Sequence, residues 1–288
     1  MPEDQATKLA RLQAAAAILA AGGCTINMDM GYIPGSFHTP TFNYGIYHES
    51  NIDITPHLTA TLGLRYDYSK VKIDYITSAA IKMDENVMGT HLSPVISSLL
   101  NHKESNYFDE FLPKVGLTYR LDNGSNFYAT WSKGYRSGGY NIQMFSDILQ
   151  SELSAQAQTA RADVDIQHDD AYYERIAKTI QFKPERSWNY EVGTHLNLFN
   201  NQLHVDIATF YMQIRNQQLS VMAGNYGFGR MMTNAGKSHS TGMELTARGA
   251  ALSNKLSYQL TYGFTSAEFD EYRSEEHTSE LQSPMRIS

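Results

Sequence analysis

Two short segments carry residue types that do chemistry in other proteins. His168, Asp169 and Asp170 have side chains of the kind that bind metal ions. A metal site needs several converging ligands, and no further His or Cys stands at ligand spacing from these three. We therefore expect a solvated polar loop there. No Ser, His and Asp set has the context of a nucleophile elbow either, so the sequence predicts no catalytic residue, no cofactor and no metal site, and we expect a protein that is not an enzyme.

The second segment is rich in glycine and runs from Gly134 to Gly139 (GYRSGG). It lacks the Gly-Lys-Ser/Thr ending of a phosphate-binding loop, and we expect no helix after it. Its glycines are suited to letting a strand leave the rim of a sheet. The candidate ligand-binding residues at that rim are Tyr135, Arg136 and Tyr140, since aromatic rings and a guanidinium form stacking and charge-assisted contacts.

The composition of the 288-residue chain favours a β-rich protein that lies at an interface. Only 18% of the residues are charged, and Tyr (19 residues) outnumbers Phe (12) and Trp (2), a bias toward rings with one polar tip. The mean hydropathy is -0.41. No run of about 18 apolar residues is present, which excludes an ordinary transmembrane helix but not a transmembrane barrel. The net charge of -7 argues against a nucleic-acid partner.

The N-terminal segment, residues 1–41, is predicted to be a helix or a loop. The stretch from Leu9 to Gly23 is rich in alanine, has leucines at helical spacing and ends in two glycines, which favours a short helix. Glu3 and Asp4 precede it, where an export signal is basic. A membrane barrel requires an export signal, so we expect the natural N-terminus to lie upstream.

From residue 42 onward, apolar and polar residues alternate. Leu62, Leu64 and Tyr66 share one face, for example, with polar residues and glycine between them. This period of two predicts strands with one face toward lipid and one toward water. About eight strands are expected, at residues 42–54, 57–75, 110–121, 125–137, 187–199, 202–215, 239–249 and 255–266. The apolar parity shifts at Lys70, so we expect either a bulge or the end of the membrane span there.

The expected connections alternate between short and long, which is typical of outer-membrane barrels. Short turns rich in Asn, Asp, Gly or Pro are predicted at residues 55–57, 122–124, 200–201 and 253–254. Long polar connections are predicted at about residues 77–109, 139–184 and 216–238. A soluble β-sandwich would have shorter strands and more even loops.

Four stretches in residues 42–272 together resemble the C-terminal barrel of TonB-dependent outer-membrane receptors. They are LGLRYD at 62–67, PKVGL at 113–117 continuing to YATWSKGYRSGGYN at 128–141, KPERSWNYEVG at 183–193, and NAG at 234–236 leading to GMEL at 242–245. The resemblance implies an all-β, antiparallel transmembrane barrel of about 22 strands, of which this chain is a partial barrel. It also implies an N-terminal plug domain and a location in the bacterial outer membrane.

The same resemblance implies a function. Such a receptor would import a ferric siderophore or a similar scarce nutrient, with energy supplied by the TonB–ExbB–ExbD complex acting on the plug, while its outer wall contacts outer-membrane lipid. Residues 273–288 form a separate segment: RSEEHTSELQS at 273–283 resembles a translated sequencing adapter, so we expect a tail that is not native. Two alternatives stay open, a passive small barrel or porin closed from eight strands and a soluble carbohydrate-binding β-domain.

Overall fold

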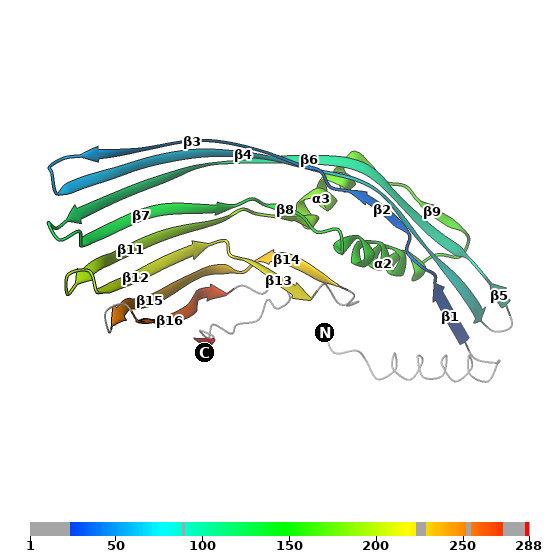
Figure 1. Cartoon of the computed structure of the whole chain (residues 1–288). Coiled ribbons are helices and arrows are strands. Elements are labelled where there is room, and N and C mark those ends of the chain that lie inside the picture. The colour runs from blue at the N-terminus through cyan, green and yellow to red at the C-terminus, as the bar shows by residue number, and fades with distance from the viewer. Residues whose placement is uncertain (1–23, 88–89, 223–228, 252–254, 273–285, 288) are drawn as a thin grey trace, which may run out of the picture.

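The chain folds into a large curved β-sheet with helices packed against part of it (Figure 1). The computed structural model describes residues 24–87, 90–222, 229–251, 255–272 and 286–287. The elements are β1 (Cys24–Met30), β2 (Gly35–His38), β3 (Thr41–Asp53), β4 (Leu58–Val87), β5 (Thr90–Leu92), β6 (Val95–Arg120), β7 (Asn126–Arg136), β8 (Gly139–Tyr140), α2 (Met144–Ala157), β9 (Val164–Ile166), α3 (Asp170–Ile180), β10 (Gln181–Phe182), β11 (Glu185–Leu198), β12 (Leu203–Arg215), β13 (Gln218–Met222), β14 (Arg230–Asn234), β15 (Gly236–Ala251), β16 (Leu256–Tyr272) and β17 (Arg286–Ile287).

The main sheet is an open, almost entirely antiparallel partial barrel, as the sequence predicted. Its strands follow the order β1, β4, β6, β7, β11, β12, β15, β16 and β17, with β2, β3 and β5 also paired to β4. Within the described residues β3 and β16 do not pair, so the sheet is not closed. No helix in these ranges is long and apolar enough to cross a membrane. The helix predicted at 9–23 and most of the tail expected at 273–288 lie outside the described residues.

All eight predicted strands are present, as β3, β4, β6, β7, β11, β12, β15 and β16. Three of the predicted short turns join them at one end of the sheet (Figure 1). Gly124, with φ of 81°, and Asn200 and Asn201, with φ of 53° and 65°, adopt left-handed angles in two of these turns. Gly and Asn tolerate such angles better than other residues. The turn predicted at Ser253–Asn254 lies outside the described residues.

β4 and β6 are far longer than predicted. They contain 30 and 26 residues, and they pair from Leu58 opposite Tyr119 to Lys82 opposite Val95 without a register shift. The long connection predicted at 77–109 is therefore wrong, because most of that range is paired backbone. A bulge at Lys70 is wrong as well. The sheet does shift register in β15, between Lys237 and Ser238.

The apolar residues of β4 change face near Lys70, and this change explains why the sequence pattern looked interrupted. Before Lys70, Leu62 and Leu64 lie on the outer, convex face and are 47% and 51% exposed. After it, Ile73 and Tyr75 lie on the inner, concave face and are 0% and 1% exposed. Side chains alternate strictly along a strand. The inner face of the second half therefore needs a covering layer.

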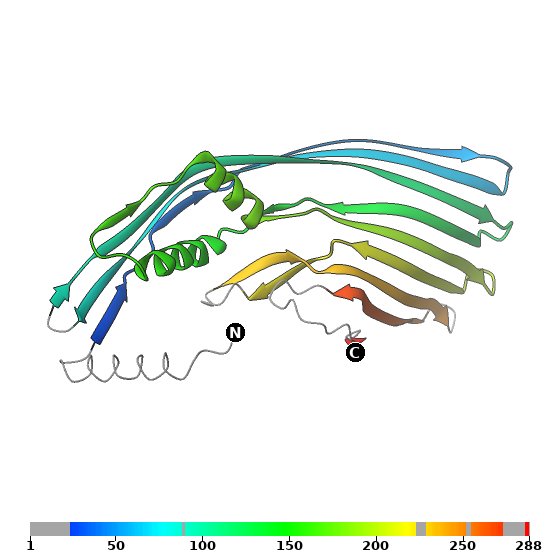
Figure 2. The ribbon, with the colours of Figure 1, turned by 180° about the vertical axis from the view of Figure 1, so that it is seen from behind.

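Two helices supply that layer, and we call α2 and α3 together the cap. Figures 1 and 2 both show the cap on the concave side of β4 and β6, away from the short turns. The apolar face of α2 repeats every four residues through Phe145, Leu149, Leu153 and Ala157, each at most 1% exposed. The connection predicted at 139–184 thus contains two helices, and the expectation of no helix after Gly139 is wrong. The connection predicted at 216–238 contains the β13–β14 hairpin.

Residues 24–38 form strands where a helix or loop was expected. β1, β2 and β3 follow one another along the same edge of β4 and are separated at Pro34 and Pro40. The two proline carbonyls still accept hydrogen bonds from β4, from the N–H groups of Ser78 (3.2 Å) and Lys72 (3.0 Å). Proline has no N–H to donate, so the strand pairing is interrupted at these two positions. The carbonyl hydrogen bonds still keep the segment against β4.

We call the main sheet the wall. Truncating the centre of the cap should loosen α2 and leave the wall folded. We expect Leu149→Ala to lower the free energy of opening α2 by about 2–5 kcal/mol, because Leu149 is fully buried and its loss leaves a cavity. Hydrogen exchange of the α2 amides measures this change. Ser151→Ala, on the exposed side of the same helix, is the matched control and should shift it by less than about 0.5 kcal/mol. Equal shifts for the two variants would contradict the packing.

The cap should also respond to the ionisation of Asp147, in the first turn of α2. Burial raises the pKa of the Asp147 carboxyl above its ordinary value of 3.8. The folded cap therefore prefers the neutral acid, so the ionised form destabilises it at pH 7, and this penalty vanishes below the ordinary value. We expect Asp147→Asn to slow exchange of the α2 amides at pH 7 and to have no effect at about pH 3. A gain of equal size at both pH values would rule ionisation out as the cause.

Candidate functional site

β7 separates from β6 where the glycine-rich segment begins. The two strands pair only as far as Ser132, although β7 stays paired with β11 to Arg136. Beyond that point the chain lies against the inner face of β6. A Cβ atom on Gly138 would lie 2.7 Å from the Phe108 ring and 2.3 Å from the Phe182 carbonyl oxygen, so only glycine fits. The glycines thus let the chain leave the wall, the role expected from the sequence.

A cluster of charges lies where the strands part, and we call Glu110, Lys133 and Arg186 the Glu110 cluster. The Glu110 carboxylate accepts hydrogen bonds from Lys133 on β7 and from Arg186 on β11. The side chains of Glu110 and Lys133 are each 12% exposed. Lys133 also lies 5.1 Å above the Trp188 ring, in a cation–π contact. Charges this buried require partners, so the cluster ties three strands together.

Three amide side chains hold the neighbouring connections. Asn141 donates to the Met232 carbonyl (2.9 Å) and accepts from the Met232 N–H (2.8 Å). Asn234 binds the backbone of Lys183 in the same two-way manner, at 2.9 and 2.7 Å. Gln218 donates to the same Lys183 carbonyl at 3.0 Å. Asn141, Lys183 and Asn234 belong to three of the stretches that carry the resemblance in the sequence, so those stretches meet at one junction.

The predicted ligand-binding residues lie beside this junction in three different environments. Arg136 is exposed, and its guanidinium makes no hydrogen bond or ion pair with other described residues. The Tyr135 hydroxyl is buried and has no hydrogen-bond partner among them. Tyr140 packs against the core of the cap, where burial raises the pKa of its hydroxyl to about 12. Arg136 is therefore the residue of the three whose polar group is free to meet a ligand directly.

His168 does not lie in a solvated loop, so that prediction is wrong. Its side chain is 3% exposed, and its Nε2 lies 2.7 Å from a carboxylate oxygen of Glu152 on α2. The hydroxyl of Ser98 on β6 donates to the other Glu152 oxygen at 2.7 Å. Asp169 is the N-cap of α3 and accepts a hydrogen bond from the Tyr172 N–H at 2.8 Å. These residues hold the cap together and fasten it to the wall.

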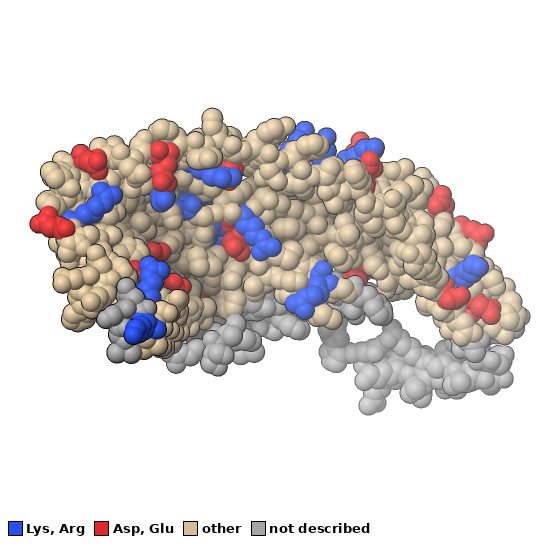
Figure 3. Space-filling model, in the orientation of Figure 1, with Lys and Arg blue, Asp and Glu red and all other residues tan. Residues whose placement is uncertain are grey.

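Charges of both signs are mixed over the surface. On the face shown in Figure 3, Lys and Arg side chains are interspersed with Asp and Glu side chains, and no single-sign patch is present among the described residues. Ion pairs such as Lys114–Glu49 (2.9 Å) and Lys103–Asp74 (2.6 Å) neutralise individual cations. A phosphate backbone needs clustered cations, and that face does not offer them. In the described residues no three His, Cys, Asp or Glu side chains gather as a metal site would require.

A family model described as "TonB dependent receptor-like, beta-barrel" matches residues 21–283. The chain belongs to this family. Among curated proteins, the Pesticin receptor of Yersinia enterocolitica serotype O:8 / biotype 1B (strain NCTC 13174 / 8081) is 24% identical to this TonB-dependent receptor barrel over 219 residues, which are 76% of the chain and 25% of that receptor. The chain thus spans about a quarter of the length of the curated relatives it matches.

Two solved structures similar to this chain are a receptor and a transporter. The ferric yersiniabactin uptake receptor FyuA from Yersinia pestis has a TM-score of 0.39 and 18% identity, with 86% of this chain and 38% of that chain covered. The FrpB iron transporter from Neisseria meningitidis (F5-1 variant) has a TM-score of 0.44 and 14% identity, with 84% and 39% covered. Family membership rests on the match to the family model.

Removing the Glu110 carboxylate should destabilise this TonB-dependent receptor barrel more than removing an exposed one. We expect Glu110→Gln to lower the free energy of unfolding by about 3 kcal/mol, because Lys133 and Arg186 lose their counter-charge in a mostly buried place. Urea unfolding followed by tryptophan fluorescence measures this change.

The matched control for Glu110→Gln is Glu49→Gln, since Glu49 pairs with Lys114 on the same wall but both side chains are about half exposed (44% and 45%). It should cost at most about 1 kcal/mol. A second variant, Glu110→Gln combined with Lys133→Met, should recover part of the loss, because the unpaired buried ammonium is removed. If Glu110→Gln cost no more than Glu49→Gln, the cluster would not hold the strands together.

Proposed function

We propose that this chain forms part of the wall and mouth of a bacterial outer-membrane receptor that imports a ferric siderophore or a similar scarce nutrient. The observation that carries the proposal is the change of face along β4. The first part of the strand has an apolar outer face, as lipid contact requires, and the second part has an apolar inner face covered by the cap. A wall that carries a folded cap above its span is suited to receiving a ligand at its mouth.

The length of the outward apolar stretch supports a membrane position. It runs from Leu58 to Tyr68, within the roughly nine to eleven residues that a tilted spanning strand needs. Aromatic rings gather at its end: Tyr68 lies 6.4 Å from Tyr44 and 6.5 Å from Tyr107 between ring centroids. Such a row of rings is typical of the membrane interface. Beyond it the outer face becomes polar, beginning with Lys70 and Lys72.

The short turns would then face the periplasm and the cap would face the outside. We place ligand contact at Tyr135, Arg136 and Tyr140, at the junction below the cap. Arg136 offers a free guanidinium, which binds carboxylate, phenolate or hydroxamate oxygens by charge-assisted hydrogen bonds. The unpaired Tyr135 hydroxyl beside it gains a partner if a ligand or an ordered water reaches the junction. Tyr140 contributes its ring from the cap side.

Transport belongs to the whole receptor. Energy would come from the TonB–ExbB–ExbD complex through a plug domain, in the manner of the family, and outer-membrane lipid would surround the wall. A passive closed barrel of eight strands fits less well, because the described sheet is open. A soluble carbohydrate-binding domain fits less well too, because it would leave the outward rows of Leu, Val and Tyr in water. No enzymatic role is proposed.

Ligand binding should depend on the charge at Arg136. Using the whole chain in detergent micelles, we would titrate ferric catecholate, hydroxamate and phenolate siderophores and follow quenching of tryptophan fluorescence. Arg136→Ala should raise the Kd of the best ligand by about 10-fold to 100-fold, since a charged hydrogen bond contributes about 1.5–3 kcal/mol.

Arg230→Ala is the matched control, because Arg230 is also exposed and its guanidinium hydrogen-bonds Ser220 within the same β13–β14 hairpin. It should leave the Kd unchanged. The proposal fails if no ferric siderophore binds, and the placement of the ligand fails if binding survives Arg136→Ala intact.

A further inference from the structure

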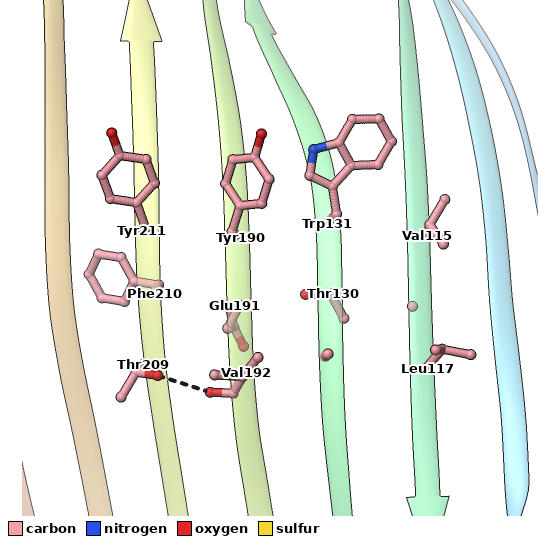
Figure 4. Close-up of a pocket in the computed structure, with 12 residues that line it drawn as sticks. Val115, Leu117, Thr130, Trp131, Tyr190, Glu191, Val192, Thr209, Phe210 and Tyr211 are labelled. Atoms are coloured by element: carbon pink, nitrogen blue, oxygen red, sulfur yellow. Dashed lines mark hydrogen bonds between the residues drawn. The ribbon is translucent and has the colours of Figure 1, made fainter.

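The outer wall contains a groove that the proposed import function does not use. It opens on the convex face across β6, β7, β11 and β12, with a volume of about 540 Å³ (Figure 4). Its lining is mainly apolar side chains of Val115, Leu117, Trp131, Tyr190, Val192 and Tyr211. Several of these are substantially exposed, Val192 by 56% and Tyr190 by 49%. A groove in an exposed apolar surface can bind an apolar ligand at a defined position.

The register of four strands explains the hollow. One row across the wall joins Val115, Trp131, Tyr190 and Tyr211. The next row joins Leu117, Ala129, Val192 and Thr209. Ala129 and Thr209 have small side chains that rise little above the sheet. Their neighbours in the first row, Trp131 and Tyr211, have large rings. The result is a groove floored by the small residues and walled on one side by aromatic rings.

The groove has a polar end. In Figure 4 the hydroxyls of Tyr190 and Tyr211 point the same way, along β12 toward its C-terminal end, while the indole nitrogen of Trp131 lies on the edge of its ring that faces Tyr190. That direction leads away from the short turns and toward the cap. Rings with one polar tip place the tip at the level of lipid headgroups. The groove therefore suits an acyl chain whose headgroup lies on the side of the cap.

Positive charge lies beyond the polar end. Lys133 follows Trp131 on β7, and Arg186 precedes Tyr190 by four residues on β11, about 13 Å at the rise of a strand. Both bind the one carboxylate of Glu110, so the Glu110 cluster has a surplus of one positive charge. The Arg186 side chain is 39% exposed, and it lies on the same face of β11 as Tyr190 because side chains alternate along a strand. An anionic headgroup, such as a phosphate, complements this charge.

We propose that the groove binds one acyl chain of lipid A, with a phosphate of the same molecule near Arg186. Lipid A is the phosphorylated, multiply acylated lipid of the outward leaflet of bacterial outer membranes, and the polar end of the groove faces that leaflet when the short turns face the periplasm. The inference rests on the proposed membrane position of the wall. Phospholipid of the opposite leaflet would have its headgroup at the wrong end.

The chain has two tryptophans, and one of them, Trp131, lines the groove, so its fluorescence reports directly on what the groove contains. In Trp188→Phe, Trp131 is the sole tryptophan. The whole chain is inserted into vesicles of brominated phosphatidylcholine, which quenches tryptophan in contact with it, and unbrominated lipid A is added. Recovery of Trp131 fluorescence reports displacement of brominated chains from the groove.

The control reporter places a tryptophan on the same convex face outside the groove, as Tyr262→Trp combined with Trp131→Phe and Trp188→Phe; Tyr262 is 53% exposed. We expect Trp131 to recover at a lipid A fraction at least about fivefold lower than the control reporter needs. Ala129→Leu fills the groove and should abolish this difference. Ala247→Leu is the matched substitution, on the outer face beside Val205 and Leu260, and should preserve it.

Each contrary result has its own meaning. Equal recovery at the two reporters, or an unchanged difference in Ala129→Leu, overturns the lipid A groove and leaves the membrane position standing. If neither reporter is quenched by brominated lipid, the wall does not contact acyl chains, and the proposed outer-membrane function falls with it.

Discussion

The unbroken backbone ladder between β4 and β6 decides where the other parts of this protein can lie. Because the register does not shift between Leu58 and Lys82, the face on which each side chain lies follows from its parity alone. Apolar residues occupy the outer face in the first part of β4 and the inner face in the second. The first part is therefore stable against lipid, and the second is stable only under another layer of protein. The lipid-facing wall and the need for a cap therefore both follow from the positions of the apolar residues along β4.

Alternation made the wall predictable, because it is a local signal that needs no knowledge of neighbouring strands. The extensions of β4 and β6 were missed because an apolar pattern that changes parity at Lys70 looks like the end of a strand when the covering layer is unknown. α2 could have been found, since Phe145, Leu149 and Leu153 recur at helical spacing within a range assigned to a loop. β1 and β2 could not, because short strands separated by prolines have little periodicity to detect.

The candidate site was predictable only in part. The glycines at 134–139 correctly marked the place where β7 leaves β6, and the local requirement for a residue without a Cβ is readable from composition. The Glu110 cluster was not readable, since Glu110 and Arg186 are 76 positions apart and meet only after three strands have aligned. For the same reason no local pattern could show that the Tyr135 hydroxyl would be buried without a partner.

The length of β4 has a mechanical consequence. Thirty residues at a rise of about 3.3 Å make a ribbon roughly 100 Å long, about three times the thickness of a hydrocarbon core. The ribbon is a cantilever, anchored in the wall and stiffened by the cap along its free part. A load at its tip reaches the anchor as a bending moment. That moment is greatest at the anchor, where β7 stops pairing with β6 at Lys114, opposite Gly63 on β4, so the Glu110 cluster lies just beyond the point of greatest bending.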